Sequence, residues 1–256
     1  MKRSIVTALA LVLLTPAAAL AKCAMPGAFF APEAGGTVPP NPTLFLFSSK
    51  WRGESAELAV LDGAGKALKF ASTIVTSTDA LIVKRLVVEA PAGEVVLELR
   101  DKRSADTAPL RARYAVAAGK PLATGRPVEL LGITEEASSW TCSYQSTRNL
   151  TPSVVAPAYR IEWASSEADY RAGKRETLVL PYRMRRFFHW GDKPFESPPA
   201  AQLELGHVNC TGRTFEWKGP IWLGVAALHE DGTEDPPAPD PVRVEPPPAP
   251  PGRGER

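Results

Sequence analysis

The chain has 256 residues, in which 30 Lys and Arg stand against 28 Asp and Glu, so the formal net charge at pH 7 is only +2. A nearly neutral surface creates no long-range field for nucleic acid or anionic membranes, which excludes both as expected partners. The 26 prolines argue against a helical protein. The length fits one large domain or two domains of about 100 residues.

The N-terminal segment is organised like a secretory signal peptide. Lys2 and Arg3 precede an apolar run at 5–14, and a small-x-small cleavage site follows at 19–21. The apolar run is too short to cross about 30 Å of hydrocarbon as a helix, and no later run reaches the ~18 residues of a membrane span. We therefore expect residues 1–21 to be removed and the protein to be secreted or periplasmic, with an uncleaved anchor as the alternative.

Three cysteines follow the signal, and an oxidising compartment favours pairing two of them. Cys142 and Cys210 both lie in strand-like segments of the second half, so we expect the disulfide between them. Cys23 would then be free, in a monomer, or would link two chains into a dimer. Leu20 stands three residues before Cys23, as in bacterial lipoprotein signals, although such signals have a small residue where Lys22 stands. A lipid anchor at Cys23 is therefore the alternative.

The stretch 37–51 organises the first half, because prolines lead directly into an apolar strand expected at 44–47. Proline cannot donate to a ladder, so Pro39, Pro40 and Pro42 predict an extended approach and a strand confined to an edge or first position. Further strands are expected at 56–61, 67–75, 81–88, 94–100 and 110–116.

Turn residues and alternation support these strands. The DGAG sequence at 62–65 favours a hairpin between its flanking strands, since Gly tolerates positive φ. Val95, Leu97 and Leu99 fall on one face of their strand, which is typical of an antiparallel sheet with one buried face. No segment sustains the helical period of 3.6 residues. The sequence therefore predicts an all-β fold.

The second half continues in this style after a Gly- and Pro-containing linker at 119–126. Its strands are expected at 128–133, 140–145, 158–163, 176–183, 202–205, 221–228 and 242–244. The Pro-rich segment 245–256 cannot bury a core, and we expect it to be a disordered tail.

Two segments in each half carry a family resemblance. They are 37–47, PAGEVVLELRD at 91–101, YRIEW at 159–163 and WLGVAALHEDGTEDP at 222–236. These units resemble bacterial immunoglobulin-like and fibronectin type III-like domains of uncharacterised secreted proteins from high-GC Gram-negative bacteria. The resemblance implies two tandem antiparallel β-sandwiches, at 28–118 and 127–244, with Trp163 packed in the core near the disulfide. Such domains share no active site, and none is inferred.

The most unusual candidate for a binding surface is RMRRFFHW at 183–190. Guanidinium groups of Arg183, Arg185 and Arg186 beside the Trp190 ring could bind a glycan, an anionic polysaccharide, lipid headgroups or a protein. The alternative is an ordinary strand with its arginines outward and its aromatic residues packed inward.

No motif specifies catalysis or a cofactor. His189, His207 and His229 lack the spacing of a zinc site, so we expect surface or half-buried loop histidines. The loop at 231–240 is acidic but lacks a calcium-binding pattern, and we expect a solvated turn. Its carboxylates belong to Asp231, Glu234, Asp235 and Asp240. Without a GxSxG or HExxH motif we expect no enzyme activity, no metal and no cofactor.

These observations favour a non-enzymatic secreted or cell-envelope interaction module that binds an unknown protein or glycan through its second domain. One alternative is a carbohydrate-active accessory protein or hydrolase, which would need carboxylates facing each other across a cleft. Another is a periplasmic chaperone-like protein, which would need an exposed strand edge. The pattern of the first-half strands does not reveal such an edge.

Overall fold

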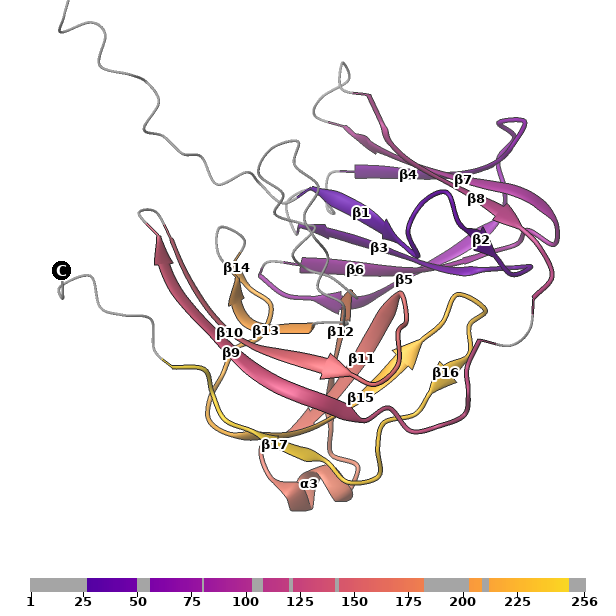
Figure 1. Ribbon diagram of the computed structural model, residues 1–256. Helices are drawn as coiled ribbons and strands as arrows, with labels where there is room; N and C mark the ends of the chain where they lie inside the picture. The colour runs from indigo at the N-terminus through magenta and orange to yellow at the C-terminus, as the bar shows by residue number, and fades with distance from the viewer. Residues whose placement is uncertain are drawn as a thin grey trace, which may run out of the picture.

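The computed structural model describes residues 27–49, 56–79, 81–102, 108–119, 122–140, 143–181, 203–208 and 212–248. Within these ranges the chain forms four β-sheets and one short helix, which confirms the predicted all-β class (Figure 1). No helix among the described residues is long and apolar enough to cross a membrane.

The first half forms a two-layer sandwich. Its strands are β1 (Ala28–Ala31), β2 (Thr37–Val38), β3 (Thr43–Ser49), β4 (Ala56–Asp62), β5 (Phe70–Ser77), β6 (Leu81–Val88), β7 (Gly93–Asp101) and β8 (Leu110–Val116). One sheet has the order β1-β3-β6-β5 and the other β2-β8-β7-β4. All pairs are antiparallel except β2 with β8. This division of strands between two sheets is that of an immunoglobulin-like sandwich.

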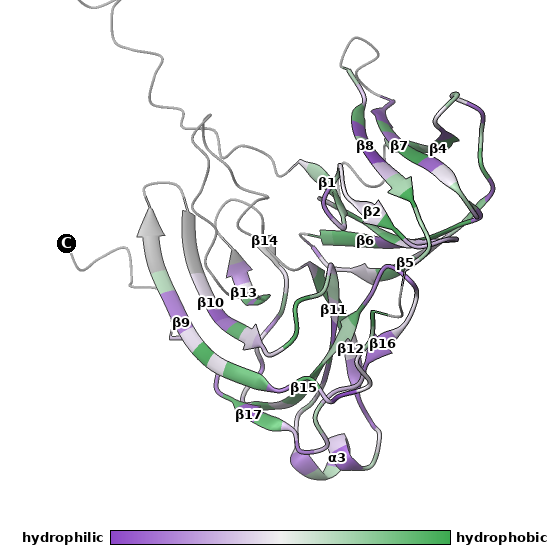
Figure 2. Cartoon of the chain, turned by 45° about the vertical axis from the view of Figure 1, so that its right-hand side comes forward, coloured by the Kyte–Doolittle hydropathy of each residue, from purple (hydrophilic) through white to green (hydrophobic). Residues whose placement is uncertain are grey.

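The second half repeats the two-layer plan. Its elements are β9 (Leu130–Trp140), β10 (Ser143–Pro152), β11 (Ala158–Ala164), α3 (Glu167–Arg171), β12 (Glu176–Pro181), β13 (Leu203–Val208), β14 (Gly212–Arg213), β15 (Ile221–Leu228), β16 (Glu234–Asp235) and β17 (Val242–Val244). The sheets have the orders β14-β13-β10-β9 and β12-β11-β15-β16, with β17 also paired to β15. Figure 2 shows hydrophobic residues concentrated along β15, whereas α3 is largely hydrophilic.

The expectation that the strand at 44–47 lies at an edge is wrong. β3 is an inner strand between β1 and β6, and all its residues are buried. Leu44 and Leu46 face the core of the first sandwich, whereas Phe45 and Phe47 face the second half. The prolines precede β3 and remove no donor from it, so they do not limit its position.

A predicted hairpin and a predicted strand are also corrected. Asp62 Oδ1 accepts hydrogen bonds from the backbone of Ala64 and Lys66, which closes the DGAG turn, but the pairing ends with one bridge between Leu61 and Ala67. The chain then crosses to the other sheet, where β5 pairs with β6. The strand expected at 140–145 instead spans the tip of the long β9–β10 hairpin.

The short helix α3 was not predicted. Its N-cap residue Ser166 accepts a hydrogen bond from the Asp169 backbone N–H at 3.1 Å, and Glu167 and Asp169 place negative charge in the first turn. Both features stabilise a helix N-terminus. One turn and a half of helix is too short to produce a visible period in the sequence.

The start of the predicted tail is held in place. Arg148 donates through Nε to the Glu245 carbonyl at 2.9 Å and through Nη2 to the Pro246 carbonyl at 2.8 Å. The Ser146 hydroxyl donates to the Pro248 carbonyl at 2.8 Å. These carbonyls belong to no strand and accept bonds from the side chains of β10 instead. Disorder therefore begins no earlier than residue 249, and for 249–256 it stays a prediction.

The two halves share a hydrophobic core. One buried cluster joins Phe45 and Phe47 of β3 and Val83 of β6 to second-half residues such as Leu180 and Val225. The sheet β1-β3-β6-β5 is therefore covered on both faces, by its partner sheet and by the second half (Figure 1). Tandem domains joined only by a linker would leave that second face exposed.

A buried hydrogen bond between β5 and β12 also crosses this interface. The Val179 backbone N–H, on β12, donates to the Thr76 hydroxyl of β5 at 2.7 Å. We expect Thr76→Val to lower the free energy of unfolding by about 1–3 kcal/mol, because the Val179 N–H is left buried without a partner. Urea unfolding measures the loss, and Thr76→Ser, which keeps the hydroxyl, is the control. An equal loss in Thr76→Ser, which retains the hydroxyl, would show that the hydrogen bond to Val179 is not the cause.

Candidate functional site

Most residues that the sequence singled out lie outside the described residues. This holds for Arg183, Arg185, Arg186 and Trp190, and for all of Cys23, Cys142 and Cys210. The proposed surface at 183–190 and the Cys142–Cys210 disulfide therefore stay predictions. Trp163 is described and packs partly buried against the second-half core, where its ring meets Phe215 at a centroid distance of 5.3 Å.

The prediction that the acidic turn at 231–240 is solvated is wrong for Asp235. Asp235 is fully buried, and His229 is buried beside it, with His229 Nε2 3.0 Å from Asp235 Oδ2. Glu234 and Asp240 instead point to Arg160 and Arg171 respectively. Across the described ranges no group of three or more His, Cys, Asp or Glu side chains is placed to hold a metal ion.

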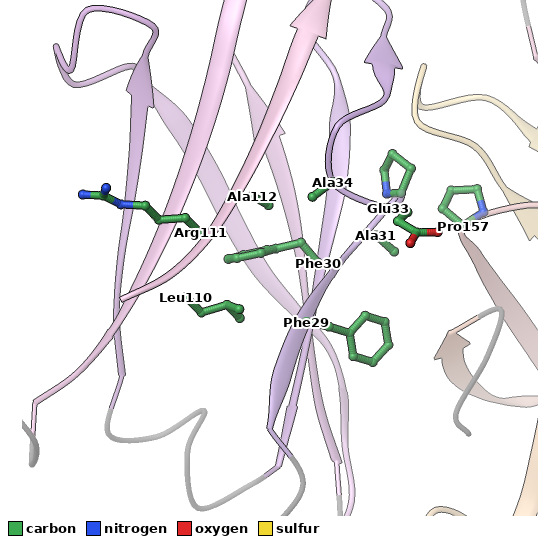
Figure 3. Close-up of a pocket in the computed structure, with 10 residues that line it drawn as sticks. Phe29, Phe30, Ala31, Glu33, Ala34, Leu110, Arg111, Ala112 and Pro157 are labelled. Carbon is green, nitrogen blue, oxygen red and sulfur yellow. The ribbon is translucent and has the colours of Figure 1, made fainter. Parts of the chain in front are cut away.

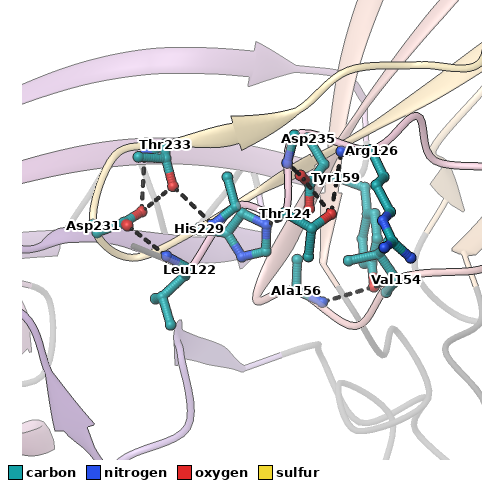
Figure 4. A network of polar contacts seen from close by, with 12 residues as sticks. Leu122, Thr124, Arg126, Val154, Ala156, Tyr159, His229, Asp231, Thr233 and Asp235 are labelled. Carbon is teal, nitrogen blue, oxygen red and sulfur yellow. Dashed lines mark hydrogen bonds and ion pairs between the residues drawn. The ribbon is translucent and has the colours of Figure 1, made fainter. Parts of the chain in front are cut away.

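The acidic turn fixes the predicted linker to the second half (Figure 4). Asp235 Oδ1 accepts from the Gly125 N–H at 2.7 Å and from the Thr124 hydroxyl at 3.1 Å. Asp231 Oδ2 accepts from the Leu122 N–H at 2.9 Å. Burial raises the pKa of both carboxyls, but hydrogen bonds, first from Thr233 to Asp231 and from His229 to Asp235, outweigh that effect, so each pKa lies below its usual value.

The same turn contacts the first half. The Thr43 N–H, at the start of β3, donates to the Glu230 carbonyl at 2.7 Å. Gly232 lies against this contact with a φ of +80°, and a Cβ there would stand 3.2 Å from Thr43 Oγ1. The 229–235 turn thus holds both the linker and β3, and it sets how the two halves meet.

A strand edge is left open where the chain crosses between the first-half sheets. After β1 the segment 32–36 passes to β2, held by the Tyr114 hydroxyl, which donates to the Pro32 carbonyl at 2.8 Å. Gly35, whose φ is +87°, donates its N–H to the Arg113 carbonyl at 2.8 Å. Burial raises the pKa of Tyr114, so its hydroxyl stays protonated as a donor.

The crossing segment covers only the end of β8. Arg113 O and Ala115 N bond to Gly35 and Gly36, so odd-numbered residues of β8 direct their backbone groups outward. By the alternation of an antiparallel strand, both backbone groups of Arg111 and the Arg113 N–H face the same way. No strand among the described residues pairs with this stretch. We call it, together with the facing strand β1, the β8–β1 edge.

A cavity of about 320 Å³ lies between the two strands of the β8–β1 edge (Figure 3). Its walls are mostly apolar and comprise Phe29, Phe30, Ala31, Pro32, Glu33, Ala34, Leu110, Arg111, Ala112 and Pro157. Phe30 points toward Leu110 and Ala112, whereas Arg111 extends away from the cavity. Pro157 comes from the second half, in a loop that Tyr159 fixes by accepting from Ala156 N and donating to Val154 O.

Charged side chains line the outer face beside this edge. Arg111 pairs with Glu98 at 2.7 Å and Arg113 with Glu94 at 3.0 Å, while the two arginine side chains stay 59% and 62% exposed. A guanidinium has five donors, so each arginine keeps N–H groups for a further acceptor. The edge thus offers backbone donors and acceptors, an apolar cavity and cationic side chains.

A second hollow of about 770 Å³ lies between β5 and the second half. Trp163 and Phe215 line it, but Phe215 packs edge-to-face against both Trp163 and Trp217, with centroid distances of 5.3 and 4.8 Å. Glycan binding by aromatic residues needs open ring faces, and these rings are engaged with one another. The β8–β1 edge is therefore the better developed binding surface.

Sequence reasoning missed the β8–β1 edge. Leu110–Val116 was predicted as a strand, but how far β2 runs beside it depends on contacts between residues far apart in the chain, such as Tyr114 with Pro32. The one available signal was the turn sequence PEAGG at 32–36, which marks a crossing without showing its reach.

Comparison with known proteins adds little. No protein-family model matches the chain, and no curated protein matches its sequence. Among solved structures, the tandem immunoglobulin domains of titin align with 86% of this chain and 95% of that chain, at 8% identity and a TM-score of 0.23. The immunoglobulin-like assignment rests on the strand order of the sheets.

Proposed function

We propose that this chain is a secreted or periplasmic, non-enzymatic interaction module that binds an extended protein segment by strand addition at the β8–β1 edge. The observation that carries the proposal is the outward-facing backbone of Arg111, which pairs with no strand among the described residues and lies beside an apolar cavity. In strand addition, main-chain hydrogen bonds supply affinity and pockets for alternate side chains supply specificity. Both components are present at this edge.

The proposed compartment is supported by the sequence. Residues 1–21 have the charged start, short apolar run and small-residue site of a cleaved secretory signal. Attachment through a lipidated Cys23 would keep the module at the envelope, where the same edge would serve a membrane-associated partner. A glycan ligand at Arg183–Trp190 is a separate prediction that the β8–β1 edge does not require.

A periplasmic chaperone-like role is the second candidate. Such a role needs an exposed strand edge, and the β8–β1 edge supplies one in the first half. The two candidates share the site and differ in the state of the partner, which is folded with an extended segment in one case and unfolded in the other.

Selection from a phage-displayed library of random peptides on the mature chain tests the proposal. We expect binders that lose about tenfold or more in affinity for Arg111→Pro, because proline removes an outward N–H without touching the β7 ladder. Arg111→Gln keeps the N–H and is the control for loss of the charge. Unfolding midpoints show whether both variants are folded.

A second readout does not depend on the variants. Hydrogen exchange of the wild-type chain should show slower exchange of the Arg111 and Arg113 amides when a selected peptide is bound. Peptides that bind Arg111→Pro as tightly as the wild type, or that leave these amides unprotected, would show that the segment docks elsewhere and that the proposal is wrong.

A further inference from the structure

We infer that the segment added at the β8–β1 edge alternates apolar and acidic residues. This inference rests on the proposed function and names the chemistry of its partner. It follows from what β8 presents on its two faces, because a strand added to a sheet continues the alternation of its neighbour.

The two faces of β8 differ sharply. Ala112 and Tyr114 are buried in the sandwich core, whereas the side chains of Arg111 and Arg113 lie on the solvent face. A residue of the partner that faces inward would meet the cavity walls formed by Phe30 and Leu110. Only an apolar side chain can enter such walls without losing hydrogen bonds to water.

On the sheet face opposite the core, one row already carries opposite charges on β7 and β8. Glu98 of β7 lies directly opposite Arg111 of β8 and pairs with it at 2.7 Å. The next position in that row belongs to the added strand. A carboxylate there would receive the remaining guanidinium donors of Arg111, whereas a lysine or arginine would face a like charge directly opposite.

The acidic wall of the cavity does not contradict this pattern. Glu33 lines the cavity from the crossing segment, on the side of Ala31 and Pro157, whereas Arg111 and Leu110 belong to the opposite wall (Figure 3). The acids of the partner would therefore lie along the outer face of β8, away from Glu33.

The same charges exclude a second copy of this chain as the occupant. Pairing two β8 edges would bring the Arg111 and Arg113 side chains of one copy against those of the other. Cationic side chains on an edge are a common means of preventing such self-association. The charges on β8 thus disfavour pairing with a second copy of β8 and favour pairing with an anionic strand.

Three fluorescently labelled peptides test the inference on the mature full chain by anisotropy at low ionic strength. They alternate Val with Glu, Val with Lys and Val with Ser. We expect the Glu peptide to bind about tenfold or more tightly than the Lys peptide, with the Ser peptide between them. Adding salt should reduce the difference in affinity between the Glu and Lys peptides, because that difference comes from exposed charges, which salt screens.

Variants then assign the preference to the two arginines. In the double variant Arg111→Gln with Arg113→Gln we expect the three peptides to bind alike, because the backbone edge and the cavity remain. Arg126→Gln, a substitution on the exposed linker, is the matched control and should leave the preference intact. Amide exchange at Arg111 and Arg113 reports whether each peptide is added to the edge.

The outcomes separate the two claims. Equal protection of the edge by all three peptides in the wild type would overturn the acidic preference and leave strand addition standing. Protection by none of them, together with no edge-dependent binder in the phage selection, would overturn strand addition and the preference with it.

Discussion

Replacing Phe47 with alanine is expected to lower the free energy of unfolding by about 3–5 kcal/mol, the cost of emptying a buried phenylalanine site. Phe47 is fully buried and stacks on Phe29 with a centroid distance of 5.0 Å. It belongs to the cluster that joins β3 to the second half. Since small domains are stable by only about 5–15 kcal/mol, this loss should be evident in denaturant unfolding.

The position of Phe47 between the two halves also predicts how the variant unfolds. Because the two halves share this cluster, we expect the wild type to unfold in one cooperative transition and Phe47→Ala to separate it into two. Leu97→Ala is the control, since Leu97 is equally buried but lies in the core of the first sandwich alone. Two transitions in the wild type, only one of which moves in Phe47→Ala, would show that the halves are independent.

Local signals in the sequence were sufficient to find many of the strands. β6, β8 and β17 were predicted at their observed bounds, because alternating apolar residues and flanking turn residues mark a strand without reference to its partners. The buried face formed by Val95, Leu97 and Leu99 is confirmed for the same reason.

Partner choice could not be predicted in this way. The turn at Asp62 forms, yet β4 and β5 belong to different sheets, because β5 gains more from pairing along the whole of β6. The prolines before β3 pointed to an edge, whereas β3 pairs with β1 on one side and β6 on the other, and so lies inside its sheet. The acidic turn was also expected to be solvated, because its donors at Thr124 and Gly125 are more than a hundred residues away in the chain.

Asp235→Ala is expected to lower the free energy of unfolding by about 1–3 kcal/mol at neutral pH, the cost of leaving a buried polar group without its hydrogen-bond partner. The substitution removes the carboxylate that receives the Gly125 N–H, the Thr124 hydroxyl and His229 Nε2. His229 stays buried without that partner, whereas Thr124 and Gly125 are exposed residues that water can reach. Asp240→Ala is the control. Asp240 pairs with Arg171 but its side chain is 81% exposed, so we expect a loss of only about 0–1 kcal/mol.

Acid should remove the contribution of Asp235 in the wild type. The pKa of Asp235 is lower in the folded chain than its ordinary value, because its hydrogen bonds outweigh the effect of burial. The carboxylate therefore stabilises the fold above the unfolded-state pKa of about 3.9, and this contribution is lost as the pH falls through the lower folded value. The difference between the wild type and Asp235→Ala should be constant from pH 7 to about pH 5 and shrink below about pH 4. A difference that persists undiminished in strong acid would mean that the packing of Asp235, rather than its charge, fixes the linker between the halves.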